Sequence, residues 1–251
     1  MARFTDKIAL VTSAASGSGA AIVRRLASEG ATVIAADKTG QEALAAELGP
    51  SVIARKLDAG SEASIAELDA YIRSAHGRLD ILVNNTGMGG PRCPLLEVTP
   101  AAAAEVFNYN ILGAYLLLQL GLRYMTAQPQ GGAVVLTASI AGLVGTPHSS
   151  PYSVSKGAVV AMCKTAAVEY AKDRVRVNCV APGPTAVPMV QRLGEPANDR
   201  LRQRIPQGRL AEPSEVAAVV AFLADDRDAG HVTAPLPYYS STNVVAFVDT
   251  G

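Results

Sequence analysis

Residues 8–19 have the sequence Ile-Ala-Leu-Val-Thr-Ser-Ala-Ala-Ser-Gly-Ser-Gly, an apolar run followed by a turn of small residues and glycines. The apolar run is typical of a buried strand, and the alanine-rich segment after Gly19 is typical of a helix. Glycines at such a strand–turn–helix junction let the backbone approach a pyrophosphate, and the free amides of the helix then face the phosphates. The stretch therefore predicts a dinucleotide site around Gly17 and Gly19.

Short β-branched segments alternate with longer alanine- and leucine-rich segments along the rest of the chain. This alternation predicts parallel strands joined by right-handed crossovers, hence an α/β doubly wound sheet with helices on both faces. No repeat or linker divides the sequence, so residues 1–251 are expected to form a single domain. About seven strands are expected, near 7–12, 32–36, 52–57, 80–83, 132–138, 174–180 and 243–249, and helices near 17–29, 40–48, 62–76, 100–127, 151–172 and 213–224.

Composition argues against several classes of function. The 22 basic and 22 acidic residues balance and are scattered, unlike the basic stripe of a nucleic-acid-binding protein. Cys93, Cys163 and Cys179 are widely spaced, without the pairs of a metal site, which favours buried thiols in a reducing compartment. The apolar stretch around 111–122 is interrupted by glycines and a glutamine and falls short of a membrane span. We therefore expect a cytoplasmic protein without a metal.

An acidic residue ends the second predicted strand. Asp37 lies 18 residues beyond Gly19, where a carboxylate can accept hydrogen bonds from both hydroxyls of an adenine ribose and repels a 2′-phosphate. Asp37 therefore favours NAD over NADP as the cofactor. The adjacent Lys38 works against this preference, because its ammonium can swing toward a phosphate. The alternative for Asp37 is a solvated acid in a turn.

A tyrosine and a lysine four residues apart indicate proton chemistry. Tyr152 and Lys156 project from one face of a predicted helix, one turn apart. An ammonium about 4 Å from a phenol, at an effective dielectric of about 20, favours the phenolate by roughly 4 kcal/mol before screening. Such a tyrosine has a lowered pKa and can exchange a proton with an alcohol or carbonyl oxygen near neutral pH. Ser139, at the end of a predicted strand, can hold the same oxygen.

Taken in order, these motifs resemble those of the classical short-chain dehydrogenases/reductases, and the resemblance covers nearly the whole chain. It implies a Rossmann-type fold and hydride transfer that interconverts a secondary alcohol and a ketone. The matching residues are Thr12–Gly19, Asp37, Asp58, Asn84–Gly87, Asn110, Ser139, Tyr152, Lys156 and Pro182–Gly183.

The resemblance also implies roles for individual residues. Tyr152 would be the general acid/base, Ser139 would orient and polarise the reacting oxygen, and Lys156 would lower the pKa of the tyrosine and bind the nicotinamide ribose. Asn110 would hold a water that passes protons through Lys156 to solvent. Asp58 would contact the adenine amino group. Besides Asp37, Tyr152 and Lys156, the cofactor contacts would come from Ser13, Ser16, Gly17, Ser18, Gly19, Asp58, Ala59, Asn85, Thr86, Gly87, Pro182, Gly183 and Thr185.

Four positions depart from the family pattern. Ser13 replaces the first glycine of the turn, where a side chain is tolerable only if φ stays negative. Thr86 replaces an alanine, which is a small change. Val187 replaces a threonine that would hold the cofactor, and Thr185 can compensate for the lost hydroxyl. Extra residues after 232–234 are expected to reshape the far side of the pocket or a subunit contact.

A proline-rich segment follows the sixth predicted strand. Residues 184–212 lie where a doubly wound fold places a substrate lid. The predicted pocket wall, residues 140–147, carries no charge, so a small uncharged secondary alcohol or ketone is the expected substrate. Five arginines in the lid weaken this inference, because any of them can swing inward. His148, beside the wall, is either a substrate contact or a turn residue.

Two other functions remain open. A 3-oxoacyl-carrier-protein reductase would have a basic patch near the end of the fifth major helix and usually uses NADP, whereas residues 125–131 are uncharged. A non-catalytic dinucleotide-binding sensor would have lost Tyr152, Lys156 or Ser139, and all three are present. Members of the family commonly form homotetramers through the two long helices, so an oligomer, tetramer or dimer, is expected.

Overall fold

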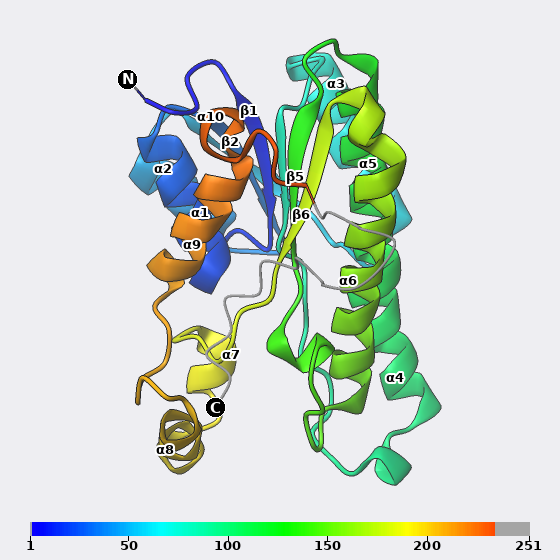
Figure 1. The fold of residues 1–251 in the computed structure, drawn as a ribbon, viewed down its shortest axis with the longest axis vertical. Helices are drawn as coiled ribbons and strands as arrows, with labels where there is room; N and C mark the ends of the chain where they lie inside the picture. Colours follow the sequence, from blue (N-terminus) through cyan, green and yellow to red (C-terminus); the bar gives the residue numbers. More distant parts are fainter. Residues whose placement is uncertain (1, 234–251) are drawn as a thin grey trace.

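Six parallel strands form the centre of the computed structural model, which describes residues 2–233 (Figure 1). The neighbouring strands follow the order β3-β2-β1-β4-β5-β6. The predicted doubly wound α/β sheet is therefore confirmed, while the strand predicted near 243–249 lies outside the described residues. The strands are β1 (Ile8–Thr12), β2 (Thr32–Asp37), β3 (Val52–Lys56), β4 (Ile81–Asn84), β5 (Gly132–Thr137) and β6 (Val175–Val180).

Helices cover both faces of this sheet (Figure 1). One layer contains α1 (Gly17–Ser28), α2 (Gln41–Leu48), α9 (Pro213–Ala224) and the short α10 (Asp226–Ala229). The other contains α3 (Glu62–Ala75), α4 (Pro100–Phe107), α5 (Gly113–Ala127) and α6 (Ser150–Tyr170).

The alternation of side chains along each strand divides the core into two clusters. Leu10 and Ile34, which are partners in the β1–β2 register, belong to the cluster beneath α5 and α6. Val11 and Val33 point the other way and belong to the cluster beneath α1 and α9. Because both faces are covered, the strands are apolar throughout, which explains why the sequence showed continuous apolar runs.

The long helix expected over residues 100–127 contains an irregular turn. Residues 108–112 between α4 and α5 form a π-helical turn, a feature that is frequent at functional sites. Pro100–Ala127 is long and apolar enough to cross a membrane by composition. However, Leu117, Leu120 and Met125 are fully buried against the sheet, so this is a core helix of the fold.

The segment after β6 leaves the sheet and returns to it at one place. It contains α7 (Pro188–Gln191) and α8 (Glu195–Arg204), which lie beyond the carboxyl ends of the strands (Figure 1). Thr185 and Ala211 form an isolated parallel bridge. The amide of Ala186 donates to the carbonyl of Ala211 at 2.8 Å, and the amide of Ala211 donates to the carbonyl of Pro184 at 3.0 Å. Both ends of the predicted lid are therefore held together.

Candidate active site

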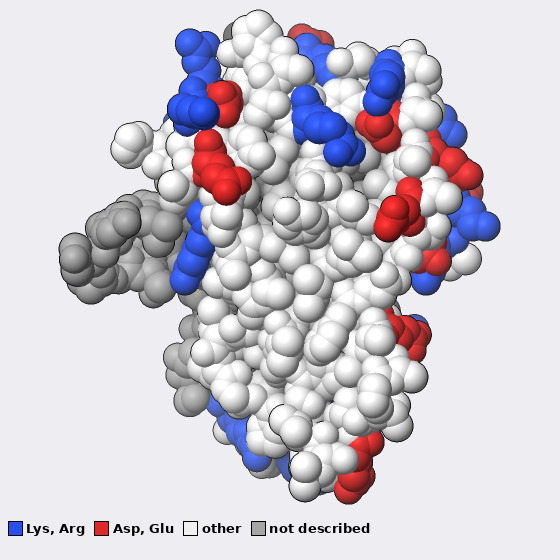
Figure 2. Space-filling view, turned by 90° about the vertical axis from the view of Figure 1, so that its right-hand side faces the viewer, with Lys and Arg blue, Asp and Glu red and all other residues white. Residues whose placement is uncertain are grey.

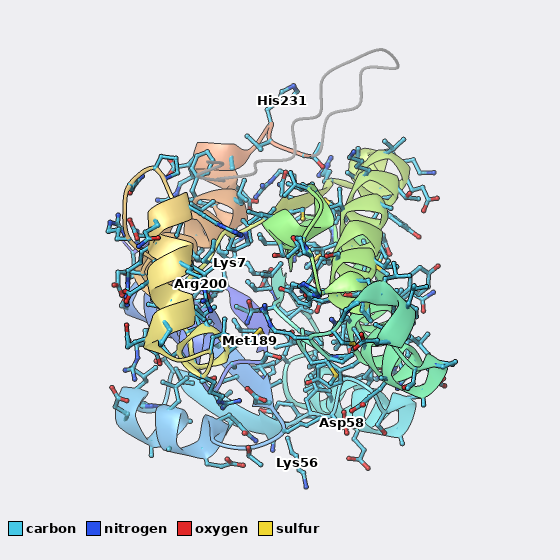
Figure 3. The ribbon with its side chains drawn as sticks, turned by 90° about the horizontal axis from the view of Figure 1, so that it is seen from below. Lys7, Lys56, Asp58, Met189, Arg200 and His231 are labelled. Atoms are coloured by element: carbon cyan, nitrogen blue, oxygen red, sulfur yellow. The ribbon has the colours of Figure 1, made fainter. Side chains whose placement is uncertain are left out.

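The predicted site residues follow the carboxyl ends of the strands. Figure 3 looks toward this end of the molecule, with Asp58 and Met189 labelled on it. Asp58 follows β3, and Met189 comes from α7 in the predicted lid. Loops after β1, β2, β4, β5 and β6 meet at the same end because all six strands are parallel.

The turn after β1 requires glycine at two positions. Gly17 has a φ of +54°, in the left-handed region that other residues avoid. A Cβ on Gly19 would lie 1.9 Å from the carbonyl oxygen of Ser13, so the start of α1 packs directly on the turn. The first amides of a helix have no partner within the helix, so the start of α1 can accept a phosphate group of a dinucleotide.

Ser13 does not have the negative φ that we expected. Its φ is +48°, so the serine occupies the left-handed conformation of the glycine it replaces. An L-residue in this region costs about 1–2 kcal/mol. Local hydrogen bonds favour the arrangement, since the Asn85 side chain donates to the Ser13 carbonyl at 3.4 Å. Burial raises the pKa of Tyr109, and the nearby Lys38 and Ser13 side chains lower it in part.

The carboxylate of Asp37 is fixed at the end of β2. One of its oxygens accepts the amide of Ala15 at 2.9 Å, and the other accepts the amide of Lys38 at 2.7 Å. The side chain is only partly buried, so its remaining lone pairs are accessible. It is therefore held beside the glycine turn in the place expected of a ribose acceptor.

Asp58 and Ala59 follow β3 on the same side of the turn. The amide of Gly60 donates to Asp58 at 3.0 Å, and the ammonium of Lys38 lies 3.1 Å from the same carboxyl oxygen. Burial opposes ionisation of Asp58, but these two partners hold its pKa below the ordinary value. Ala59 is buried, and its carbonyl lies under Gly113 at the start of α5.

The Asn84–Gly87 segment connects the glycine turn to the helix that carries Tyr152. The hydroxyls of Thr86 and Thr12 lie 2.8 Å apart, so the threonine that replaces the usual alanine is internally paired. The amide of Asn85 donates to Thr12 at 3.0 Å. A Cβ on Gly87 would lie 2.9 Å from the Nζ of Lys156, so this glycine packs directly against the lysine side chain.

Ser139 and Tyr152 lie together, from the end of β5 and the first turns of α6. Burial raises the pKa of the Tyr152 hydroxyl, and a hydrogen bond with the Ser139 side chain lowers it in part. The Ser139 oxygen also accepts the amide of Ala141 at 3.2 Å, which fixes its position. Two hydroxyls are therefore directed to one place, where they can hold an alcohol or carbonyl oxygen.

Lys156 is buried one turn beyond Tyr152. Its Nζ donates to the carbonyls of Thr137 at 2.7 Å and Thr86 at 3.2 Å, and lies 5.8 Å from the centre of the Tyr152 ring. Burial lowers the pKa of Lys156 to about 8, against a smaller raising effect of Cys179. The Lys156 ammonium thus points at the two backbone carbonyls and, among the described residues, makes no hydrogen bond with the Tyr152 hydroxyl. The lowering of the Tyr152 pKa by Lys156 that the resemblance implies stays a prediction.

Asn110 holds the loop after β4. Its Oδ1 accepts the amide of Met88 at 2.8 Å, and its Nδ2 donates to the carbonyl of Met88 at 2.9 Å and to Ser155 at 3.0 Å. The side chain is fully buried in the π-helical turn. It therefore joins the loop to α6, while its expected part in a water relay stays a prediction.

Arg92, an exposed residue on the loop after β4, is a candidate that the sequence did not reveal. Its positive charge lowers the pKa of Tyr152, after the larger effects of burial and Ser139. The loop that carries it passes Lys156 at Gly87 and the sulfur of Met189 at Gly89. Among residues 2–233 no carboxylate forms an ion pair with Arg92. Its only sequence signal is a position shortly after the Asn-Asn-Thr-Gly motif.

The segment after β6 faces the glycine turn. The hydroxyl of Thr185 is buried and donates to the carbonyl of Gly183 at 3.0 Å, so it is engaged within its own loop. The carbonyl of Pro182 accepts the amide of Ile140 at 3.1 Å, which joins this loop to the end of β5. The side chain of Val187 lies against Gly17, 2.9 Å from where a Cβ would be.

Neither a metal cluster nor a disulfide is found in the described part of the chain. Cys163 and Cys179 are buried free thiols and Cys93 is partly buried. No group of three or more histidine, cysteine, aspartate or glutamate side chains among residues 2–233 is placed to hold a metal ion.

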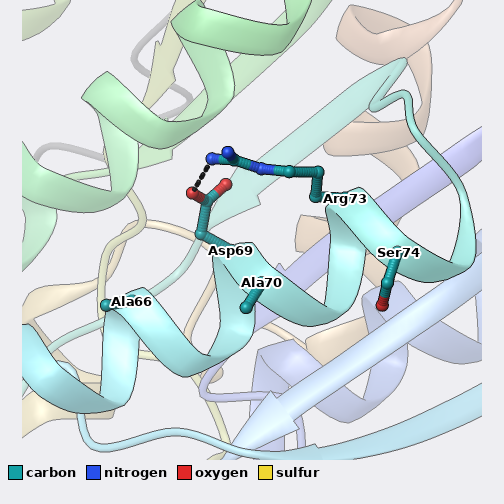
Figure 4. Close-up of a pocket in the computed structure, with 5 residues that line it drawn as sticks. All are labelled: Ala66, Asp69, Ala70, Arg73 and Ser74. Atoms are coloured by element: carbon teal, nitrogen blue, oxygen red, sulfur yellow. Dashed lines mark hydrogen bonds and ion pairs between the residues drawn. The ribbon is translucent and has the colours of Figure 1, made fainter.

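A surface hollow on α3 lies apart from these residues (Figure 4). The guanidinium of Arg73 pairs with Asp69 at 2.8 Å across it. It contains none of the predicted site residues and is lined by Ala66, Asp69, Ala70, Arg73 and Ser74.

Fold and site together define a dinucleotide-dependent oxidoreductase, and comparison with known proteins identifies its family. Residues 13–235 match the family model described as enoyl-(acyl carrier protein) reductase. The chain belongs to the classical short-chain dehydrogenase/reductase family and acts on alcohol and ketone groups, as the resemblance implied.

Several characterised proteins are similar over almost their whole length. The chain is 40% identical to cis-4-hydroxycyclohexanecarboxylate dehydrogenase of Sinomonas cyclohexanicum over 89% of this chain and 91% of that one. It is 37% identical to 3-oxoacyl-[acyl-carrier-protein] reductase of Thermotoga maritima over 92% and 95%. A crystal structure of levodione reductase superposes with a TM-score of 0.88 at 36% identity, covering 92% of this chain and 95% of that chain.

Proposed function

We propose that the protein is an NAD(H)-dependent dehydrogenase/reductase that interconverts a small uncharged secondary alcohol and a ketone, with Tyr152 as general acid/base. The observation that supports it most is the effect of the Ser139 side chain on the Tyr152 hydroxyl, at the same end of the parallel sheet as the glycine turn and Asp37. The fixed carboxylate of Asp37 favours a cofactor with free ribose hydroxyls. Because Tyr152, Lys156 and Ser139 are all in place, we prefer catalysis to a sensor role.

In this proposal, residues of the described part of the chain supply each step that the protein performs. The bound nicotinamide would donate or accept the hydride. Ser139 holds and polarises the substrate oxygen, and Tyr152 exchanges the proton with it. Since burial raises the pKa of Tyr152, its hydroxyl is protonated at neutral pH and ready to protonate a ketone oxygen. Alcohol oxidation needs the phenolate and is expected to become faster as the pH rises.

An assay of a panel of alcohols and ketones with NAD(H) and NADP(H) tests this function. Replacing Tyr152 by Phe should lower kcat by about 10²–10⁴ while NADH still binds. Tyr170→Phe, at the far end of the same helix, is the matched control and should retain activity. Replacing Asp37 by Ala should erode the preference for NAD. Turnover of the Tyr152→Phe variant at the unsubstituted rate would remove the proposed acid/base.

Arg92 favours a second candidate, a dehydrogenase of a cyclic hydroxy acid. Its guanidinium has no carboxylate partner among the described residues and acts electrostatically on Tyr152, so a carboxylate on the substrate would gain a partner near the reacting oxygen. The similar enzyme of Sinomonas cyclohexanicum is named for such a substrate. Arg92→Gln should raise KM for cis-4-hydroxycyclohexanecarboxylate about tenfold, as expected for about 1.4 kcal/mol of lost binding. An unchanged KM for the acid would rule this candidate out.

The outer face of α4, α5 and α6 is consistent with self-association. Figure 2 shows a broad face with few charges on the side that these helices occupy. The described face includes the exposed apolar side chains Tyr115, Val154 and Val168. We propose a cytoplasmic homo-oligomer, dimer or tetramer, with this face buried between copies. Light scattering that finds only monomer for the unsubstituted protein would contradict it.

A further inference from the structure

Lys38 is the cation next to the predicted ribose acceptor, and two groups hold it. Its Nζ lies 3.1 Å from the Asp58 carboxylate and 4.8 Å from the centre of the Tyr109 ring. Asp58 comes from the end of β3 and Tyr109 from the π-helical turn, so elements on two sides hold one ammonium. Lys38 thus connects the loop after β2 to the end of β3 and to the π-helical turn.

The two groups that hold Lys38 are themselves fixed. The amide of Gly60 donates to Asp58, and the Asn108 side chain donates to the carbonyl of Gly60 at 3.0 Å. The Tyr109 ring packs beside Gly60, with a ring carbon 3.4 Å from where a Cβ of Gly60 would lie. Gly60 therefore contacts both groups that hold Lys38.

Asp37, by contrast, makes no ion pair with Lys38. Both of its oxygens accept backbone amides, from Ala15 and from Lys38 itself. A 2′-phosphate on the adenine ribose would lie beside Asp37 and would need a nearby cation to offset the repulsion. The Lys38 ammonium is instead directed to Asp58.

We propose that Asp58 and Tyr109 act as specificity-determining residues by holding Lys38 away from the ribose 2′-position, so that this lysine does not support binding of NADP(H). This inference rests on the proposed preference for NAD and adds Asp58 and Tyr109 to Asp37 as residues that determine it. Lys38 and Asp58 are both about half exposed, at 50% and 45%, so the hold is modest and can be released by substitution. Lys56, the register partner of Asp37 on β3, lies at the rim of the molecule and provides a neighbouring cation without this hold (Figure 3).

Direct binding of reduced cofactors tests this hold without relying on activity. The dissociation constants of NADPH and NADH would be measured by fluorescence titration. A substitution that weakens contacts shared by the two cofactors changes both constants equally and leaves their ratio unaltered. Asp58→Asn combined with Tyr109→Leu should lower the NADPH/NADH ratio about 3- to 10-fold, as expected for loss of one partly exposed ion pair and one cation–π contact. Adding Lys38→Met should abolish that gain. Circular dichroism checks that each variant is folded, and Asp58→Asn alone, which retains the Gly60 bond, is the milder variant.

Matched substitutions distinguish the holding of Lys38 by Asp58 and Tyr109 from a general change of charge near the cofactor. Tyr109→Phe keeps the ring over Lys38 and should leave the ratio unchanged, as should Lys56→Met. Lys38→Met in the unsubstituted protein should also leave it within about twofold, because a held lysine contributes little to phosphate binding. A gain that persists without Lys38 would assign the effect to lost repulsion by Asp58 and overturn the proposal. An unchanged ratio in the released variant would overturn it too, whereas failure of Asp37→Ala to alter cofactor preference would contradict only the proposed use of Asp37.

Discussion

Asn110 holds both backbone groups of Met88: its Oδ1 accepts the Met88 amide and its Nδ2 donates to the Met88 carbonyl. One buried side chain in the π-helical turn thereby fixes the start of the loop that reaches Arg92. The same Nδ2 also donates to Ser155 on α6, next to Lys156. Asn110 therefore links the π-helical turn between α4 and α5 to α6, the helix that carries Tyr152 and Lys156.

Removal of this side chain should loosen the loop and lower stability. Asn110→Ala leaves the backbone of Met88 without its partners, at a cost of about 1–3 kcal/mol in the free energy of unfolding. Denaturant unfolding measures this loss. Asn108→Ala, an exposed asparagine two residues earlier, is the matched control and should change stability by about 0.5 kcal/mol or less. Equal effects at both positions would show that Asn110 has no special anchoring role.

Arg92 should affect the pH dependence of alcohol oxidation. Its charge lowers the pKa of Tyr152, so Arg92→Gln should raise that pKa and move the rise of kcat/KM with pH to higher pH. Arg92→Lys keeps the charge and should leave the profile in place. A profile for an uncharged alcohol that is identical in the Gln variant would mean that Arg92 does not act on Tyr152.

Lys156 should make stability rise with pH in the alkaline range. Its pKa is about 8 in the folded protein, against about 10.5 in the unfolded chain, so between these values the unfolded chain binds the additional proton. The free energy of unfolding therefore increases from pH 8 to pH 10.5, by about 3 kcal/mol in total. Urea unfolding without cofactor at several pH values measures this slope. The Lys156→Met variant should lack this slope, so the difference in the free energy of unfolding between the two proteins should increase with pH. Parallel curves for both proteins would contradict a lowered lysine pKa.

Gly19 should tolerate no side chain. Gly19→Ala places a methyl group 1.9 Å from a backbone oxygen, so α1 must move, at a cost of about 1–3 kcal/mol. The displacement of the helix start should also weaken NADH binding, measured by fluorescence titration. Gly145→Ala meets nothing within 4 Å and should leave both quantities nearly unchanged. Normal stability of the Gly19→Ala variant would mean that this turn can relax.

The sequence predicted the sheet and most of the helices because their signals are local. Apolar runs and turn residues placed the six described strands within a few residues, and the order of the motifs placed Ser139 and Tyr152 at the same end. Parallel topology then brings distant strand ends together, without knowledge of side-chain positions. The strand predicted near 243–249 cannot be compared, as it lies outside the described residues.

Features that depend on three-dimensional contacts were not predictable in this way. The π-helical turn differs from an α-helix by one hydrogen-bond step and leaves the apolar pattern of residues 100–127 unchanged. The positive φ of Ser13 goes with packing at Gly19 and with a hydrogen bond from Asn85, which is far away in the sequence. Arg92 and the direction of the Lys156 ammonium depend on the path of a loop and on backbone carbonyls.

The bridge between Thr185 and Ala211 has a consequence for how this enzyme can change over time. The segment between Thr185 and Ala211 leaves the sheet and returns at this bridge, so its length can change without moving its two ends. The entropic cost of closing a flexible loop grows by only about 0.6 kcal/mol for each doubling of its length. Insertions or deletions between those two residues would leave the six strands in place, provided that Arg209 still pairs with Glu215 at the start of α9. If this segment is the substrate lid predicted from the sequence, changes in its length offer a route to new substrates at little cost to the stability of the rest of the protein.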